Sequence, residues 1–230
     1  MEKNQFDLCC EVLKRFDRAG ILDDMVFIGS WCVYFYQDYF SNVPYINQLA
    51  LKTRDIDVLI PSPRKIRSSM DLPSLVQDLG YIVSFDQHTG QMRLDHPALI
   101  MEFLVPKIGI GSDKPQNIDM LGINAFPIRY TNILEQEIIN VEIEGIKLRI
   151  PHPVSFAFQK LLICSRRIIL EKGQKDRNTA IKILHLVIQK GEVGKMIELF
   201  NRLGTKQRRL IVRELKREDE DDIIKILLST

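Results

Sequence analysis

Two aspartates have the spacing of residues that bind a metal ion together with a phosphate. Asp55 and Asp57 are two residues apart in the segment 55–60, which alternates polar and apolar residues before Pro61. This alternation predicts a strand with one polar face, so both carboxylates should point to the same side. Hard divalent ions such as Mg²⁺ use one or two carboxylates together with substrate phosphates, which makes this strand a candidate phosphate-metal platform.

Glu102 is a candidate third ligand. It is the single acid in the otherwise apolar segment Leu99 to Val105, which predicts another strand. Burying a lone carboxylate is costly unless it meets a cation or a hydrogen-bond partner. Glu102 would serve as a ligand if its strand neighbours the Asp55 strand, and the alternative is an edge-strand glutamate that faces water.

Gly29 and Ser30 form a candidate phosphate-binding turn. The apolar run Met25 to Ile28 predicts a strand, and the aromatic stretch Trp31 to Phe40 predicts a helix whose aromatic rings pack in the core rather than stack on bases. Glycine permits close approach of the backbone, and N–H groups at the start of a helix attract anions. The Ser30 hydroxyl could add a further donor.

These segments resemble, in the right order, the sequence pattern of the nucleotidyltransferase-fold superfamily. The matching pieces are Phe27-Ile-Gly29-Ser30-Trp31, Thr53-Arg54-Asp55-Ile56-Asp57-Val58 and Met101-Glu102-Phe103. The likeness continues through the segment 150–160 and Lys172-Gly-Gln-Lys175-Asp176-Arg177, and it looks like bacterial families related to abortive-infection toxins and minimal nucleotidyltransferases. The interval between Ser30 and Asp55 is longer than in minimal members, which an insertion around residues 41–52 would explain.

The resemblance implies a metal-dependent transferase. Two Mg²⁺ ions would be bound by Asp55, Asp57 and Glu102, one activating an acceptor hydroxyl and the other neutralising charge toward pyrophosphate. The substrate would be a nucleoside triphosphate, and the acceptor would be RNA, a protein or a small molecule. The alternative is an inactive nucleotide-binding or protein-interaction module on the same fold. The nucleotide-binding residues would be Gly29, Ser30, Lys160 and Lys175.

The basic residues of the second half each have two interpretations. Lys160 is either a point-charge donor to the triphosphate or an exposed helix lysine. The cluster of Arg166, Arg167, Lys172 and Lys175 either faces phosphates or forms a solvated helix end. Asp176 is predicted to be the N-cap of the helix that follows it.

The periodicity as a whole predicts an α/β (α+β) fold. A nucleotidyltransferase-type mixed sheet flanked by helices would occupy residues 1–151, and a helical bundle residues 152–230. In the first half we expect a helix with Phe6 to Phe16 on its apolar face, ended near Gly20, and a second helix from Leu72 to Leu79. Further strands are expected at 81–85, 91–94 and 99–105, a loop at 106–122, and a hairpin of 138–143 and 146–150. In the second half helices are expected at 154–170, 176–190, 193–203 and 206–228, the last either continuous or broken near Glu218.

Composition narrows the functional classes. The chain has 230 residues and a formal charge of +2, so its overall charge does not indicate a nucleic-acid partner. Such a partner would have to be inferred from a local cluster of basic residues. The basic residues from Lys206 to Arg217 precede an acidic run, which favours an ion-paired surface over an RNA-binding patch. The four cysteines lack metal-ligand spacing and the four histidines are scattered, which indicates reduced core cysteines and structural histidines. No leader or membrane span is evident, so we expect a cytoplasmic protein without a membrane partner.

Overall fold

The computed structural model describes residues 3–43, 54–66, 69–107, 109 and 113–229. The chain divides into two compact units. We call Met1–Phe35 with Ala50–Pro151 the sheet unit, and Tyr36–Leu49 with His152–Thr230 the helical unit. Of the described residues before Pro151, residues 36–43 cluster with the helical unit. In the described part of the chain, no helix combines the length and apolar content that a bilayer span requires.

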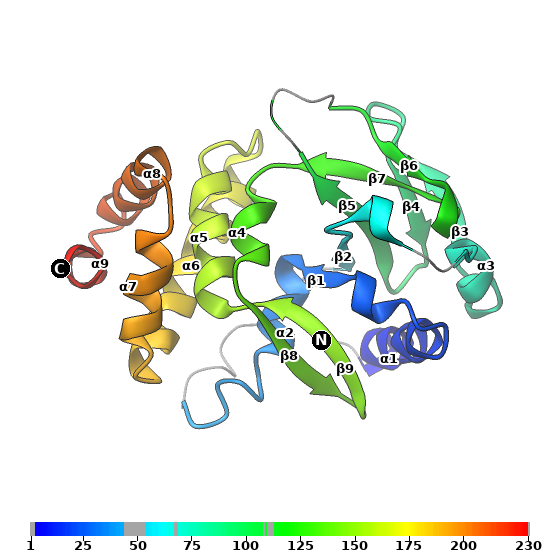
Figure 1. Cartoon of the computed structure of the whole chain (residues 1–230), viewed down its shortest axis with the longest axis horizontal. Helices are drawn as coiled ribbons and strands as arrows, with labels where there is room; N and C mark the ends of the chain where they lie inside the picture. The colour runs from blue at the N-terminus through cyan, green and yellow to red at the C-terminus, as the bar shows by residue number, and fades with distance from the viewer. Residues whose placement is uncertain (1–2, 44–53, 67–68, 108, 110–112, 230) are drawn as a thin grey trace. The chain divides into compact units, whose positions relative to one another are not determined.

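A mixed seven-stranded sheet forms the centre of the sheet unit (Figure 1). Its main order is β1 (Val26–Ile28), β2 (Asp55–Leu59), β5 (Ile100–Pro106), β4 (Met92–Asp95) and β3 (Ile82–Phe85). β7 (Ile123–Ile128) pairs with β5, and β6 (Gln116–Ile118) pairs with β7. β2 and β7 both run parallel to β5, whereas β1 is antiparallel to β2 and β4 to β5.

Most predicted elements of the sheet unit are confirmed. The first helix is α1 (Lys3–Arg18), the second is α3 (Leu72–Val76) continued by the 3₁₀ turn Gln77–Leu79, and β1 to β5 lie at the predicted strand segments. The hairpin consists of β8 (Ile138–Ile143) and β9 (Ile146–Pro151). Its two-residue turn has Glu144 at φ 50° and Gly145 at φ 81°, the left-handed pair that such a turn requires.

The predicted loop at 106–122 is wrong in its described residues. It contains β6 and a 3₁₀ turn at Asp119–Leu121, and it leads to β7 and α4 (Thr131–Glu135), which the sequence analysis did not predict. β6 has three residues, and the run of β7 contains Asn124 and Pro127. β6 owes its place to pairing with β7, and β7 owes its place to pairing with β6 and β5, which local periodicity does not report.

The helix predicted at 31–40 is much shorter in the structure. A 3₁₀ turn at Gly29–Trp31 leads into α2, which covers only Cys32–Phe35. Within the helical unit, the Tyr36 ring packs edge-on against Phe156 with centroids 5.7 Å apart, and the Tyr39 hydroxyl lies 2.8 Å from His152 Nε2. These long-range contacts override the local helical spacing. The insertion expected around residues 41–52 lies, from residue 44 onward, outside the described residues.

The helical unit contains five helices in its described residues. They are α5 (Pro153–Cys164), α6 (Leu170–Gln189), α7 (Val193–Asn201), α8 (Thr205–Lys216) and α9 (Asp221–Leu228), so the last predicted helix is broken near Glu218. Proline at the first position of α5 suits a helix start, and His152 Nδ1 caps the same end by accepting from the Val154 N–H. All four cysteines are free and buried, as predicted.

Candidate functional site

The three predicted acids lie on one face of the sheet. Asp57 pairs with Glu102 and Asp55 with Ile100 in the parallel register of β2 and β5. Side chains directly opposite each other, and those two residues apart on one strand, share a face. Asp55, Asp57 and Glu102 therefore leave the sheet on the same side, which the alternation predicted for the two aspartates and the pairing of β2 with β5 adds for Glu102.

The Gly29-Ser30 turn adjoins the second of these acids. β1 ends at Ile28, which pairs with Asp57, and Gly29 follows at φ 72°. A Cβ placed on Gly29 would overlap the Oδ2 of Asp57 and lie 2.7 Å from its Cγ. The Asp57 carboxylate therefore packs directly against the backbone of the turn, and the longer interval between Ser30 and Asp55 does not separate the two.

Glu102 has a cationic partner that the sequence analysis missed. Arg93 lies opposite it in the antiparallel register of β4 and β5, and the two side chains form an ion pair with Arg93 Nε 2.7 Å from Glu102 Oε1. The Glu102 side chain is 20% exposed. Burial raises the pKa of its carboxyl most, the charge of Asp55 raises it further, and Arg93 and Gln91 oppose them only in part. The available signal was Arg93 alternating with the buried Met92 and Leu94, but only the strand pairing connects it to Glu102.

Two of the three predicted acids, Asp55 and Asp57, suit a divalent cation as they stand. In the part of the chain that the structure describes, no three His, Cys, Asp or Glu side chains lie close enough together to form a metal site. Asp55 and Asp57 alone still match the one or two carboxylates that Mg²⁺ uses when substrate phosphates complete its shell. Glu102 would have to give up its ion pair with Arg93 to become a third ligand.

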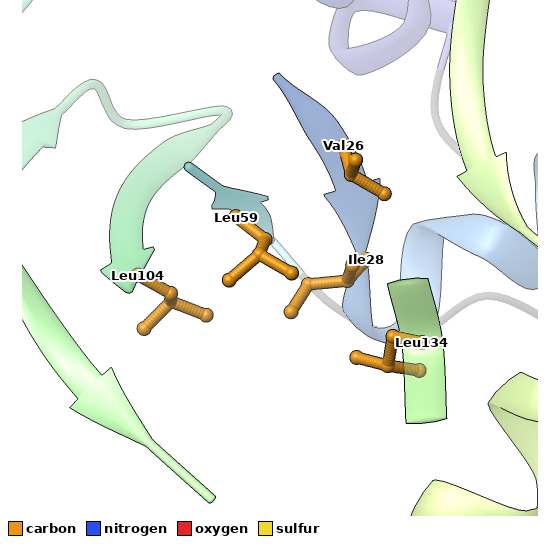
Figure 2. Packing of buried hydrophobic residues seen from close by; sticks show 5 residues of the cluster. All are labelled: Val26, Ile28, Leu59, Leu104 and Leu134. Carbon is orange, nitrogen blue, oxygen red and sulfur yellow. The ribbon is translucent and has the colours of Figure 1, made fainter. Parts of the chain in front are cut away.

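The same face of the sheet becomes apolar beyond the acids. Figure 2 shows Val26 and Ile28 of β1, Leu59 of β2, Leu104 of β5 and Leu134 of α4. All five are buried in one cluster, with α4 supplying the leucine that covers the strands. This apolar packing fixes β2 against β5, and so it holds the register that brings Asp57 opposite Glu102.

A separate cavity of about 590 Å³ lies at the other end of these strands. Its lining includes Pro61 to Lys65, which follow β2, and Val105 to Lys107, which end β5 and follow it. Asp55 is the first residue of β2, so this cavity is at the opposite end of the strand from Asp55. It does not contain the predicted acids.

The two predicted lysines differ in their surroundings. Lys160 on α5 is 5% exposed, and its Nζ forms an ion pair 2.5 Å from Asp176 Oδ1. Arg167 Nε bonds the other oxygen of the same carboxylate at 2.8 Å. Lys175 on α6 is exposed. The interpretation of Lys160 as an exposed helix lysine is therefore wrong.

Asp176 is not an N-cap, contrary to prediction. It lies inside α6, which begins at Leu170, and it is buried. The ion pairs with Lys160 and Arg167 explain why an acid is tolerated there, because a buried carboxylate needs a cationic partner. The apolar series after Asp176 suggested a start at that point, but the helix begins earlier, at Leu170.

Known proteins share a family pattern and a fold with this chain. A family model described as Nucleotidyltransferase matches residues 8–195. The crystal structure of ANT(2″)-Ia in complex with adenylyl-2″-tobramycin is similar with a TM-score of 0.50 and 12% identity, covering 94% of this chain and 99% of that chain. An antigenic nucleotidyltransferase-like protein from Paracoccidioides brasiliensis gives a TM-score of 0.51 and 14% identity, covering 100% of this chain and 96% of that one. A search of curated proteins finds no match. At these identities the two structures show a common fold.

Proposed function

Because the chain belongs to the nucleotidyltransferase family, we propose that it transfers a nucleoside monophosphate from a nucleoside triphosphate to a hydroxyl group and releases pyrophosphate. The observation that carries the proposal is the contact between the Asp57 carboxylate and the Gly29 backbone, with Asp55 on the same face. This contact places a carboxylate pair beside a turn whose backbone N–H groups suit a phosphate.

In this proposal, Asp55 and Asp57 hold Mg²⁺ together with the triphosphate. When bound, Mg²⁺ neutralises phosphate charge and lowers the pKa of a coordinated hydroxyl. Gly29 lets the Asp57 carboxylate lie against the main chain of the turn, because a Cβ at this position would overlap the carboxylate. The Ser30 hydroxyl follows in the same turn and donates to a phosphate oxygen.

Glu102 is the third acid of the proposed site, with Arg93 as its counter-ion. Its ion pair is also the observation that favours a second candidate function. A carboxylate held by a guanidinium is a poorer metal ligand, so the chain could bind a nucleotide without turning it over. The two functions differ in whether pyrophosphate appears.

The lysines take different parts in the proposal. The Lys160 ammonium is engaged by Asp176, so its first role is to join α5 to α6, and any contact with the triphosphate comes second. Lys175 is exposed on α6 and is the better candidate for a phosphate contact. Both assignments concern positioning of the nucleotide rather than the reacting atoms.

The acceptor classes remain RNA, a protein or a small molecule. Small hydroxyl-bearing molecules belong in an acceptor screen because the ANT(2″)-Ia crystal structure contains adenylyl-2″-tobramycin. Kinship with bacterial families related to abortive-infection toxins and minimal nucleotidyltransferases is a further part of the proposal.

The test measures pyrophosphate release by the full chain from each of the four NTPs, with Mg²⁺ or with EDTA, over an acceptor screen. We expect Mg²⁺-dependent release that Asp57→Asn abolishes. The matched control is Asp119→Asn, which removes the same charge from an exposed position in the turn at Asp119–Leu121. Unchanged turnover in a folded Asp57→Asn protein would exclude the proposed site.

Thermal unfolding with each nucleotide separates the two candidate functions. A ligand that binds only the native state raises the melting temperature by mass action. Nucleotide-dependent stabilisation that Asp57→Asn removes, without pyrophosphate from any acceptor, would support the binding module. Neither stabilisation nor release would contradict both functions.

A further inference from the structure

Four arginines line a pocket inside the helical unit. The pocket has a volume of about 720 Å³ and includes Arg167, Arg177, Arg213 and Arg217 in its lining. Arg167 precedes α6, Arg177 lies on α6, and Arg213 and Arg217 lie on or directly after α8. Convergence of guanidinium groups from separate elements is a built arrangement rather than the periodic charge of one helix surface.

Glu214 holds three of these arginines in place. It is fully buried on α8, and its carboxylate accepts hydrogen bonds from Arg177 Nη2 at 3.0 Å, Arg213 Nη2 at 2.9 Å and Arg217 Nη1 at 3.2 Å. Burial raises the pKa of the Glu214 carboxyl, but Arg213, Arg177 and Arg217 together outweigh burial and hold the pKa below its usual value. An ionised carboxylate therefore orients the guanidinium groups before any ligand arrives.

The bonds to Glu214 leave N–H donors for a ligand. Each guanidinium has five donors, and Arg213 uses Nε and Nη2 here while Arg217 uses Nη1. Arg167 bonds Asp176 through Nε. In this part of the described chain, five cationic side chains form ion pairs with only three carboxylates. The cations are the four arginines and Lys160, and the carboxylates are those of Asp176, Glu214 and Glu218. Glu171 in the lining reduces this positive excess without cancelling it.

The close approach of α6 to the end of α5 shapes one wall of the pocket. A Cβ on Gly173 would lie 2.6 Å from the Cys164 carbonyl oxygen, so only glycine allows this approach. Leu170, at the rim, is 86% exposed. The pocket thus joins a guanidinium-rich interior to an apolar edge and has the volume of a small-molecule site.

We propose that this pocket binds the phosphate group of a small phosphate-bearing molecule, independently of the acids of the sheet unit. Planar guanidinium groups in a fixed fork match phosphate oxygens and bind them in pairs. The volume of about 720 Å³ suits a small ligand, whereas a nucleic-acid strand needs an extended groove that follows its backbone.

The experiment is calorimetric titration of the full chain with inorganic phosphate and pyrophosphate in EDTA, which removes metal-dependent binding. Arg213→Gln with Arg217→Gln should weaken binding at least about tenfold, because two charge-assisted contacts are lost. The matched control is Lys206→Gln with Arg209→Gln, two exposed cations on the same helix, which should stay within about twofold. Arg167→Gln tests the pocket from a different element and should also weaken binding.

The outcomes separate this site from the proposed enzyme site. Asp57→Asn should leave phosphate binding in EDTA unchanged, whether or not it abolishes pyrophosphate release. If the pocket and control variants lose phosphate affinity equally, the effect comes from the overall charge of the protein and the proposal is overturned. Binding of single-stranded RNA without binding of phosphate or pyrophosphate would also overturn it, as would the absence of any phosphate binding.

Discussion

The Asp57 carboxylate lies against the main chain of Gly29, so closely that a Cβ on residue 29 would overlap Asp57 Oδ2. Two constraints therefore meet at Gly29. Its φ of 72° is in the region that favours glycine, and the space beside it is filled by the acid. A side chain there would disturb the backbone and the carboxylate together.

Gly29→Ala should impair both stability and activity. The backbone strain and the overlap should lower the free energy of unfolding by about 1–3 kcal/mol. Displacement of Asp57 should lower pyrophosphate release at least about 100-fold, because misplacement of about 1 Å can have that effect. Urea unfolding and the release assay measure the two quantities.

Gly90→Ala is the matched control for Gly29→Ala. Gly90 has φ 71°, but a Cβ there would meet nothing within 4 Å in the described structure. It should lower stability by about 1 kcal/mol through backbone strain and leave turnover intact. Equal activity losses in the two variants would show that strain, and not the Asp57 contact, is responsible.

Glu102→Gln should change how stability depends on pH. The pKa of the Glu102 carboxyl is raised by burial first and by Asp55 next, against the pull of Arg93, so the folded state holds the proton more tightly than the unfolded chain. The stability that this provides is full below the ordinary value of 4.5 and is lost as pH rises through the folded pKa. The unfolding free energy of the wild type should therefore fall relative to Glu102→Gln over that window.

Urea unfolding at several pH values, starting near pH 4, checks this slope. Glu142→Gln, at an exposed position of β8, is the reference variant. In Arg93→Gln the counter-ion is absent, so the pKa of Glu102 should rise further and the loss of stability should extend to higher pH. If the unfolding free energy of the wild type instead rises with pH relative to that of Glu102→Gln, the pKa of Glu102 is not raised in the folded state.

Period-two alternation was sufficient to place the aspartates. Asp55 and Asp57 share a face in any strand, so their side could be predicted without knowing the neighbours. The hairpin was equally local, since Glu144-Gly145 adopts the left-handed pair that joins two β-branched runs. Glu102 could be assigned to the same site only if its strand neighbours the Asp55 strand. The parallel pairing of β2 and β5 meets this condition.

The missed features depend on pairing between distant segments. Arg93 is one cation among many until β4 pairs with β5 and sets it opposite Glu102. Likewise Asp176 has the appearance of a helix start, and only Lys160 on another helix explains a carboxylate inside α6. Sequence patterns describe which face a residue takes, whereas these partners are set by tertiary packing.

The exposed strand β3 should promote association at high concentration. It is the last strand in the main order of the sheet, and it exposes 67% of Ile82 and 60% of Phe85. Apolar side chains on an edge strand favour pairing with another chain, and lysine there opposes it. Ile82→Lys with Phe85→Lys should lower light scattering on concentration without changing pyrophosphate release.

Ile82→Leu with Phe85→Leu is the control, because it keeps the strand apolar. It should scatter light as the wild type does. If the lysine and leucine variants associate equally, β3 is not the contact surface.

Lys160→Met tests whether the buried pair of the helical unit is structural. The variant leaves Asp176 buried with Arg167 as its remaining ion-pair partner, so the free energy of unfolding should fall by less than the about 3–5 kcal/mol typical of a buried charge left without a partner. Asp176→Asn leaves the Lys160 ammonium buried without this carboxylate and should lower stability by at least as much. Because both single changes disrupt one interaction, the double variant should lose less than their sum.

Urea unfolding of the four proteins gives the coupling energy, and Lys175→Met, an exposed change on α6, should stay within about 0.5 kcal/mol of the wild type. Nucleotide titration separates the two roles of Lys160. A stable Lys160→Met protein with weakened NTP binding would mean that the ammonium serves the triphosphate first. A destabilised Lys160→Met protein that binds NTP normally when folded would mean that the Lys160 ammonium is structural. Its ion pair with Asp176 would then serve to hold α5 against α6.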